Sequence, residues 1–492
     1  MIEEKEPKAP EAKLALFGRH EIHTAVSQIT RNNLLMVLNK AIAVHHMNAA
    51  EIDYLYKYMK GEQPILHRTK DIRPEICNRI VENHASEIAQ FTSGYFMGEP
   101  VTYVRRGDRE EAGKEVDKLN TYMWYEDKAS HDKNLATWMA VCGVAYRMVL
   151  PDGGEAEEDE SPFELDVPDP RNTFVVYSTG FGHKRVMGAR EIFHEESDGS
   201  IRTTYAVYTP DTYYEVENGA ITVEKAHSLG DVPIYEYRLN LPMMGAFEPA
   251  IPLLDAINSI QSNRADGVEQ FVQSFLKFKN CEIEESDVER IHQMGAIIIK
   301  STQQGMDSDV EIVSQELNQQ QTQTLVDYLY DQVLVICGMP STKKGGTSTS
   351  DTGAAVMLRD GWQQCEARAR DTERLFEKSE RMFLKLVLRI IRATVADFDL
   401  SLSEVECKFT RRQHDNLLTK TQSLLHMLEA GLAPEVAIAT SGLFNDPMDV
   451  AEQSAEYLKK WEHKEMVSDD DDTTVHTGGW GYNRRYGVNN YA

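Results

Sequence analysis

Long apolar runs and a secretory leader are both missing from this sequence of 492 residues. No stretch reaches the ~18 to 20 continuous apolar residues that a membrane-spanning helix requires. The first residues, MIEEKEPKAPEAK, lack the basic-then-apolar order of a signal peptide. We therefore expect a protein that is made in the cytoplasm and has no membrane partner.

Cysteine is scarce and scattered along the chain. The six cysteines form no CxxC pair, and no secretory context favours disulfides between them. They are Cys77, Cys142, Cys281, Cys337, Cys365 and Cys407. This spacing favours reduced, mostly buried thiols over a disulfide framework or a zinc site.

Basic charge is in deficit, with 52 Lys and Arg residues against 79 Asp and Glu residues and a net charge of −27. Such a field repels phosphate, which excludes a protein that coats DNA by general electrostatic attraction. A pore through which DNA slides is not excluded, because a repulsive wall would prevent the DNA from sticking.

Catalytic motifs are missing as well. Gly107–Lys114 approaches a phosphate-binding loop, but its glycines are one residue too far apart and Glu115 replaces the Ser or Thr that holds Mg²⁺. His45 and His46 are adjacent, so on a helix they point ~100° apart and cannot share a metal. Acidic runs such as His194–Glu196 are typical of solvated loops. We expect no enzyme activity, no cofactor and no metal.

The chain does contain the patterns of a folded α+β body. Apolar residues make up 41% and charged residues 27% of it, as in ordinary globular proteins. Apolar residues at steps of three and four predict helices over Ala25–Lys60 and Ile76–Phe96. Between Cys142 and Glu217, β-branched and aromatic runs predict several short strands, and the turn Asn218-Gly219 closes the last one.

After Pro249 the pattern is predominantly helical. It predicts a helix over Pro249–Phe278, a hairpin formed by Ala296–Lys300 and Val310–Val313, and a returning helix over Gln315–Cys337. A polar loop follows, and then a helix over Gly353–Val395 that would be ~64 Å long. Two helices separated by a small module form a stalk with the loop at its other end, although an ordinary helical hairpin with a flexible connection has the same pattern.

Short motifs in a fixed order connect this chain to a known family. Asn78–Asn83 leads into Gly94–Val101. The motifs downstream are Gly143–Tyr146, Asp169-Pro170, Phe174–Tyr177, Val232–Tyr237, Phe247–Pro249 and Leu254–Ala256. In this order and spacing the sequence resembles the portal proteins of tailed bacteriophages, of the siphophage type, over roughly Ile52–Trp461.

The resemblance implies the portal fold, which is α+β and predominantly helical, with named parts. These would be a flexible arm at 1–24, a wing at 25–248, a stem helix at 249–279, a clip with a β-hairpin at 280–314, a second stem helix at 315–338, a tunnel loop at 339–352, a long wing helix and strand at 353–410, a helical crown at 411–464 and a disordered tail at 465–492.

The resemblance also implies a function that depends on assembly. The subunits would form a dodecameric ring, or one of about thirteen in isolation, at the unique capsid vertex of the virion. The ring would be the channel for genome packaging, DNA retention and ejection. Its partners would be the terminase large subunit, major capsid and scaffold proteins, a head-completion or adaptor protein, and double-stranded DNA contacted without sequence preference.

Two groups of candidate site residues follow from the resemblance. The tunnel-loop residues that would face DNA are Lys343, Lys344, Thr347 and Ser348. The clip residues that would face the terminase and the connector are Glu282, Glu284, Glu285, Asp287 and Glu289.

Some features depart from the family pattern and keep alternatives open. Arg411–His414 stands where family members often have Asn, an apolar residue and Pro, and the tail after Asp469–Asp472 has no counterpart. One alternative is a structural scaffold or adaptor of virion assembly that forms no pore. Another is an enzyme that uses scattered carboxylates and a metal.

Overall fold

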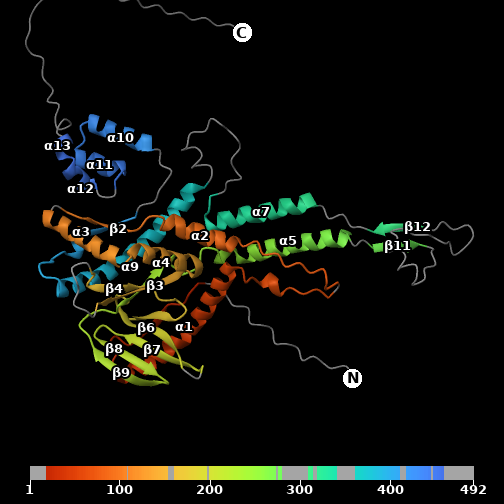
Figure 1. The fold of residues 1–492 in the computed structure, drawn as a ribbon, viewed down its shortest axis with the longest axis horizontal. Coiled ribbons are helices and arrows are strands. Elements are labelled where there is room, and N and C mark those ends of the chain that lie inside the picture. The colour runs from red at the N-terminus through yellow and green to blue at the C-terminus, as the bar shows by residue number, and fades with distance from the viewer. Residues whose placement is uncertain are drawn as a thin grey trace, which may run out of the picture. The chain divides into compact units, whose positions relative to one another are not determined.

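A computed structural model gives the fold and divides the chain into two compact units, Met1–His414 and Asp415–Ala492 (Figure 1). The described residues are 18–71, 73–107, 109–152, 160–196, 199–272, 275–279, 309–313, 319–340, 361–409, 417–444 and 447–458. Both helices and sheets are present, as predicted.

The first unit begins with strand β1 (Ile22–Thr24) and helix α1 (Arg31–Lys60). β1 pairs in parallel with β5 (Thr173–Ser178), so the predicted flexible arm over residues 1–24 is wrong at its end. The helix also starts later than the predicted Ala25, because Thr30 is extended and forms a capping box with Asn33.

A six-stranded sheet packs against the first half of α1. Its order is β1-β5-β6-β7-β8-β9, and the remaining strands are β6 (Arg185–Glu195), β7 (Ile201–Tyr208), β8 (Thr212–Glu217) and β9 (Ala220–Ala226). The turn between β8 and β9 uses Asn218 and Gly219, both with positive φ, as its sequence predicted. Leu34 and Leu38 of α1 are buried in one core with Phe174 of the sheet.

The second core surrounds a three-stranded sheet of order β10-β3-β4. Its strands are β3 (Val144–Pro151), β4 (Phe163–Asp166) and β10 (Ile234–Arg238), and the helices around them are α3 (Glu110–Tyr125), α4 (Lys128–Cys142) and α9 (Trp362–Thr394). The first six residues of β3 are buried, which is typical of a strand covered on both faces. A separate pair joins β2 (Thr102–Arg105) to β13 (Val405–Lys408).

Helix α9 has 33 residues and starts at Trp362, not at the predicted Gly353. The residue before it, Gly361, has a φ of +84°, so it lies outside the right-handed helical region and caps the helix. Residues 353–360 of the prediction lie outside the described residues.

Helix α2 (His84–Phe96) is also shorter than the predicted Ile76–Phe96. Asn83 accepts a hydrogen bond from the Ser86 N–H and thereby caps the helix. The residues before Asn83 are extended and pack along another helix instead, as described below.

Helices α5 (Ile251–Val272) and α7 (Gln319–Cys337) lie side by side and lead to the strand pair β11 (Phe275–Lys279) and β12 (Asp309–Val313) (Figure 1). The predicted helix Pro249–Phe278 is therefore wrong at Phe275–Phe278, which belong to β11. The antiparallel register places Phe275 opposite Val313 and Lys279 opposite Asp309. The other predicted hairpin strand, Ala296–Lys300, lies outside the described residues.

The second unit is helical in its described residues. It contains α10 (Leu417–Glu429), α11 (Pro434–Ser441), α12 (Pro447–Gln453) and α13 (Ala455–Leu458). Ser454 separates α12 from α13. Leu428, Ala437 and Ile438 are buried in this unit.

Candidate functional site

The predicted DNA-facing residues Lys343, Lys344, Thr347 and Ser348 lie outside the described residues. The same holds for the predicted clip residues Glu282, Glu284, Glu285, Asp287 and Glu289. The structure does describe the elements before and after these ranges, which are β11 and β12 around residues 280–308 and α7 and α9 around residues 341–360. The candidate site is therefore built from this frame.

The described residues on either side of 341–360, a range that contains most of the predicted tunnel loop (339–352), come close together. Residues 341–360 connect Pro340, after α7, to Gly361, before α9. A Cβ atom built on Gly361 would lie 3.8 Å from the Cα of Pro340, so the chain returns to the place that it left.

A left-handed cap ends α7 at the first of these two roots. Gly338 has a φ of +69°, and the N–H groups of Gly338 and Met339 donate to the carbonyls of Val335 and Leu334 at 3.2 and 2.9 Å. These bonds satisfy carbonyls that the helix end would leave unpaired.

Arg368 of α9 fixes this cap from outside. Its Nη1 donates to the Ile336 carbonyl at 2.8 Å. A Cβ atom on Gly338 would approach Arg368 Cδ to 2.5 Å, so only glycine fits there without a shift. Nearby, the Tyr95 hydroxyl of α2 donates to Glu366 of α9 at 2.9 Å. The loop thus starts from three helices that are tied together.

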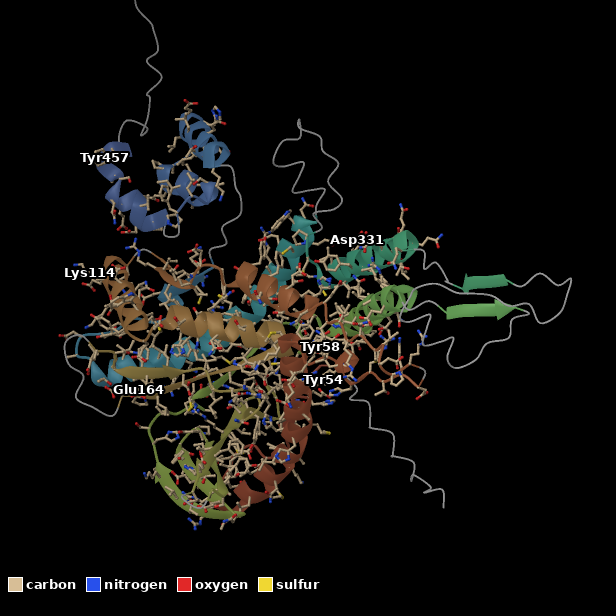
Figure 2. The ribbon with its side chains drawn as sticks, turned by 45° about the vertical axis from the view of Figure 1, so that its right-hand side comes forward. Tyr54, Tyr58, Lys114, Glu164, Asp331 and Tyr457 are labelled. Atoms are coloured by element: carbon tan, nitrogen blue, oxygen red, sulfur yellow. The ribbon has the colours of Figure 1, made fainter. Side chains whose placement is uncertain are left out.

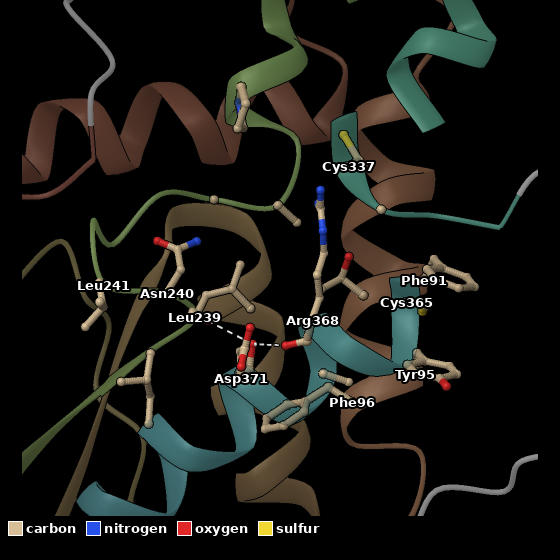
Figure 3. A pocket seen from close by; sticks show the side chains of 18 of the residues that line it. Phe91, Tyr95, Phe96, Leu239, Asn240, Leu241, Cys337, Cys365, Arg368 and Asp371 are labelled. Atoms are coloured by element: carbon tan, nitrogen blue, oxygen red, sulfur yellow. Dashed lines mark hydrogen bonds between the residues drawn. The ribbon is translucent and has the colours of Figure 1, made fainter. Parts of the chain in front are cut away.

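An apolar pocket of about 690 Å³, here called the root pocket, lies between these helices (Figure 3). It is lined by Phe91, Thr92, Tyr95 and Phe96 of α2, residues 239–242, 245, 246 and 249 after β10, Ile336, Cys337 and Gly338 of the α7 end, and Cys365, Arg368, Ala369, Asp371, Thr372, Arg374 and Leu375 of α9. The Thr372 hydroxyl donates to the Leu239 carbonyl at 2.9 Å and holds α9 against the chain after β10. Burial raises the pKa of Cys337 to about 12, so this thiol stays protonated.

An extended segment, residues 78–82, binds α5 to the body. The N–H groups of Asn78, Ile80 and Glu82 donate to Asp266 Oδ1, Ser262 Oγ and Asn258 Oδ1 at 2.7, 3.0 and 2.8 Å. Two extended residues advance ~6.6 Å and four helical residues ~6.0 Å, so alternate N–H groups match every fourth helical side chain. These three side chains of α5 accept the hydrogen bonds that a neighbouring strand would otherwise accept. We call this row of three hydrogen bonds the α5 ladder.

Asp266 is the charged end of this ladder. Lys70 and Arg68 both pair with it, the latter at 3.2 Å, and its side chain is 3% exposed. Burial alone would raise the pKa of Asp266, but Lys70 and the two hydrogen bonds from Asn78 hold it below its ordinary value. The carboxylate therefore stays charged and keeps both cations on the side of α5.

The other end of α5 is attached to α1. The Tyr58 hydroxyl donates to Asp255 Oδ1 at 2.8 Å, and Figure 2 shows Tyr54 and Tyr58 in the second half of α1. Tyr58 is buried against Phe247, with ring centroids 5.9 Å apart. α5 is thus held near both of its ends by residues of the first 100 of the chain.

A buried charge cluster joins α9 to α4 and to the three-stranded sheet. Arg147 of β3 pairs with Glu380 of α9 at 2.9 Å and with Asp132 of α4. Lys128 lies 2.6 Å from Asp132 and 3.1 Å from Glu380. The hydroxyls of Tyr103 and Tyr237 donate to Glu380 at 2.6 Å each. Burial alone would raise the pKa of Glu380, but Lys128, Arg147 and the two hydroxyls hold it well below its ordinary value.

Among the residues that the structure describes, no three His, Cys, Asp or Glu side chains gather in a way that could hold a metal ion. No helix of the described chain has the length and apolar character needed to cross a membrane.

A family model decides what this frame belongs to. The model described as "Phage portal protein, SPP1 Gp6-like" matches residues 38–464, which is most of the chain. The chain belongs to this portal protein family. The predicted resemblance is confirmed, and the loop roots, the root pocket and the α5 ladder are features of a phage portal family member.

Two solved structures are similar to the chain at low identity. One, "Neck of empty GTA particle computed with C6 symmetry", is 14% identical with a TM-score of 0.38 and covers 73% of this chain and 90% of its own. The other, "Virion of native gene transfer agent (GTA) particle", is 12% identical with a TM-score of 0.38 and covers 80% and 94%. No curated protein matches the chain.

Sequence analysis missed the residues that build the frame. Asn258, Ser262 and Asp266 follow each other at steps of four, so they form a polar stripe along one line of α5 that indicates a polar partner. The root pocket and the Arg147–Glu380 pair join residues far apart in the sequence, and no local pattern announces them.

Proposed function

We propose that this chain is the portal subunit of a tailed phage or a related particle. Its ring would form the channel at one capsid vertex through which the genome is packaged, retained and ejected. The observation that carries the proposal is the arrangement of α5 and α7, which lead to β11 and β12 at one end and to the closed roots of residues 341–360 at the other (Figure 1). Family membership supports the same assignment.

Ring formation is supported by an apolar stripe on α7. Leu325, Tyr328, Val335 and Ile336 are 47, 59, 44 and 39% exposed, although Val326 and Val333 of the same helix are buried against the body. An exposed apolar stripe on a helix whose other face is already packed is typical of a protein interface. We propose that this stripe contacts the next subunit of a homo-oligomeric ring.

DNA contact is proposed for the tunnel loop. Lys343 and Lys344 would touch the phosphate backbone, and Thr347 and Ser348 would add neutral polar contacts. The net charge of −27 per subunit would keep the rest of the wall repulsive, so contacts would be few and independent of sequence.

Partner docking is proposed for the clip. The acidic set Glu282, Glu284, Glu285, Asp287 and Glu289 would face the terminase large subunit during packaging and head-completion proteins afterwards. The major capsid and scaffold proteins would hold the ring in the virion. No enzymatic step is assigned to the chain, since portal proteins are structural.

The mass and symmetry of the purified chain test this proposal. Native mass spectrometry and class averages should show a ring on the order of twelve to thirteen subunits with a central hole. A stable monomer or dimer at high concentration would overturn the channel and favour a scaffold or adaptor that forms no pore.

A further inference from the structure

The root pocket is a large, mainly apolar cleft that opens to the surface. Its volume is about 690 Å³, within the ~300 to 1,000 Å³ of pockets that bind ligands. Leu241 on its rim is 74% exposed and Ile336 is 39% exposed. A pocket of this size and character fits a short apolar peptide segment.

A segment of matching chemistry lies at the start of the chain. Leu14, Ala15, Leu16 and Phe17 form an apolar run between the charged residues 1–13 and Gly18. The run ends where the described fold begins, so its last residue is covalently joined to Gly18.

Gly18 is fixed at the rim of the root pocket. Its N–H donates to Glu248 Oε1 at 3.2 Å, and the other oxygen of this carboxylate accepts from the N–H of the pocket residue Gly245 at 2.8 Å. A Cβ on Gly18 would lie 2.0 Å from the carbonyl oxygen of Pro242, a second pocket residue. The chain therefore emerges against the pocket wall.

Arg19 locks this exit point. Its guanidinium pairs with Glu248 at 2.8 Å and Glu51 at 3.0 Å, and its side chain is 1% exposed. Its N–H donates to the Met243 carbonyl at 3.2 Å. The anchor holds the apolar run beside the pocket at a high effective concentration, because four residues reach at most ~13 Å.

We propose that Leu14–Phe17 folds back into the root pocket of its own subunit. The segment would then cover the apolar walls contributed by α2, α7 and α9 and brace the roots from which residues 341–360 start. This inference goes beyond the proposed function and does not depend on ring formation. The same run from a neighbouring subunit is the competing occupant.

A cross-link identifies the occupant. Cys337 and Cys365 line the pocket, so Leu16→Cys treated with a short bis-maleimide should join residue 16 to one of them within one chain. Mass spectrometry of the peptides locates the link, and a denaturing gel shows whether it is intrachain. The link should disappear when Cys337→Ala and Cys365→Ala are added, and Ala9→Cys, outside the apolar run, should give far less. Links between chains would overturn the proposal, as would the absence of a link to Cys337 and Cys365 under conditions in which a simple monofunctional maleimide labels both thiols.

Thiol reactivity gives a second readout in the full chain. Replacing both Leu16 and Phe17 with Asp should expose the pocket and speed alkylation of Cys337 and Cys365 by about tenfold. Ala9→Asp is the matched control and should change neither rate. Cys142, which is 0% exposed in the core, reports any general unfolding. Unchanged rates at Cys337 and Cys365 in the double variant would contradict docking, whatever ring the protein forms.

Discussion

Glu380 shows at the scale of one residue how a buried charge is made tolerable. The carboxylate is fully buried but accepts from two tyrosine hydroxyls and faces both Arg147 and Lys128. Removing one partner of such a group leaves uncompensated charge in the core. Glu380→Gln should therefore destabilise the first unit by about 3 to 5 kcal/mol in urea unfolding. Glu377→Gln on the exposed side of α9 should cost less than about 1 kcal/mol.

Acid should remove the same contribution. The pKa of Glu380 in the folded state lies below its ordinary value of 4.5, so its charge stabilises the fold above that pH and the stabilisation is lost as pH falls below it. Between pH 5 and 3, as approximate values, the wild type should lose more stability than Glu380→Gln does. Equal losses would show that Glu380 is not the group concerned.

A side chain at position 338 would have two costs, which are backbone strain at a positive φ and a steric clash with Arg368. Gly338 and Gly219 have φ values of +69° and +76°, but only at Gly338 would a Cβ meet a neighbour, Arg368. Gly219→Ala should cost about 1 kcal/mol for backbone strain alone. Gly338→Ala should cost clearly more and should release the bond from Arg368 to Ile336, measurable as faster hydrogen exchange at the end of α7. Equal costs for the two variants would show that Arg368 moves freely.

At the scale of elements, the α5 ladder joins the backbone N–H groups of residues 78–82 to side-chain oxygens of α5, as a neighbouring strand's carbonyls would. Ser262→Ala leaves the Ile80 N–H without its acceptor, and an unsatisfied buried donor costs about 1 to 3 kcal/mol. Hydrogen exchange should accelerate over residues 78–82. Ser259→Ala, on an exposed position of the same helix, should leave exchange unchanged.

The elements that sequence reasoning placed well carry local signals. β5 and β6 contain continuous apolar, buried runs, whereas β8 alternates in burial and ends in a recognisable turn. α7 ends at Cys337 as predicted because Gly338 follows it. Helix α3 could also have been predicted, since Ala112, Val116 and Leu119 have helical spacing. It was not, because the glycines at 107 and 113 were compared with a phosphate-binding loop. β11 could not be read, because Phe271 and Phe275 continue the helical spacing and the strand partner is more than 30 residues away.

At the scale of the whole molecule, the family could be predicted from the sequence, whereas the site frame depends on contacts between distant segments. Asn78 meets Asp266 across a separation of 188 residues, and Arg147 meets Glu380 across 233. Periodicity reports which face of an element is buried but not what covers it. The predicted site residues of the tunnel loop and the clip stay predictions.

The proposed subunit contact through the exposed apolar stripe of α7 (Leu325, Tyr328, Val335 and Ile336) can be tested by its effect on ring assembly. Tyr328→Glu places a charge in the proposed subunit contact, where burial without a partner is unfavourable. Native mass spectrometry should show loss of the ring while the thermal stability of the subunit is kept, because Tyr328 is 59% exposed. Gln320→Glu, an exposed position one helix turn or more away, should still form rings.

The basic residues of the tunnel loop are tested in the assembled particle. Lys343→Ala combined with Lys344→Ala removes the two cations proposed to touch DNA phosphates, so packaging rate or DNA retention should fall while ring formation is unaffected. The matched change is Thr347→Ala with Ser348→Ala, which leaves the charge intact. Unchanged packaging and retention in the lysine variant would end the proposed role of these charges.

The meeting of Pro340 and Gly361 makes the segment between them a replaceable part. When the ends of a loop already touch, doubling its length costs only about 0.6 kcal/mol of closure entropy, and the strands and helices around it do not have to move. We therefore expect that insertions between Pro340 and Gly361 leave the fold of the described residues unchanged. On the proposed function, the bore of the channel becomes a quantity that selection or an engineer can adjust independently of the scaffold that carries it.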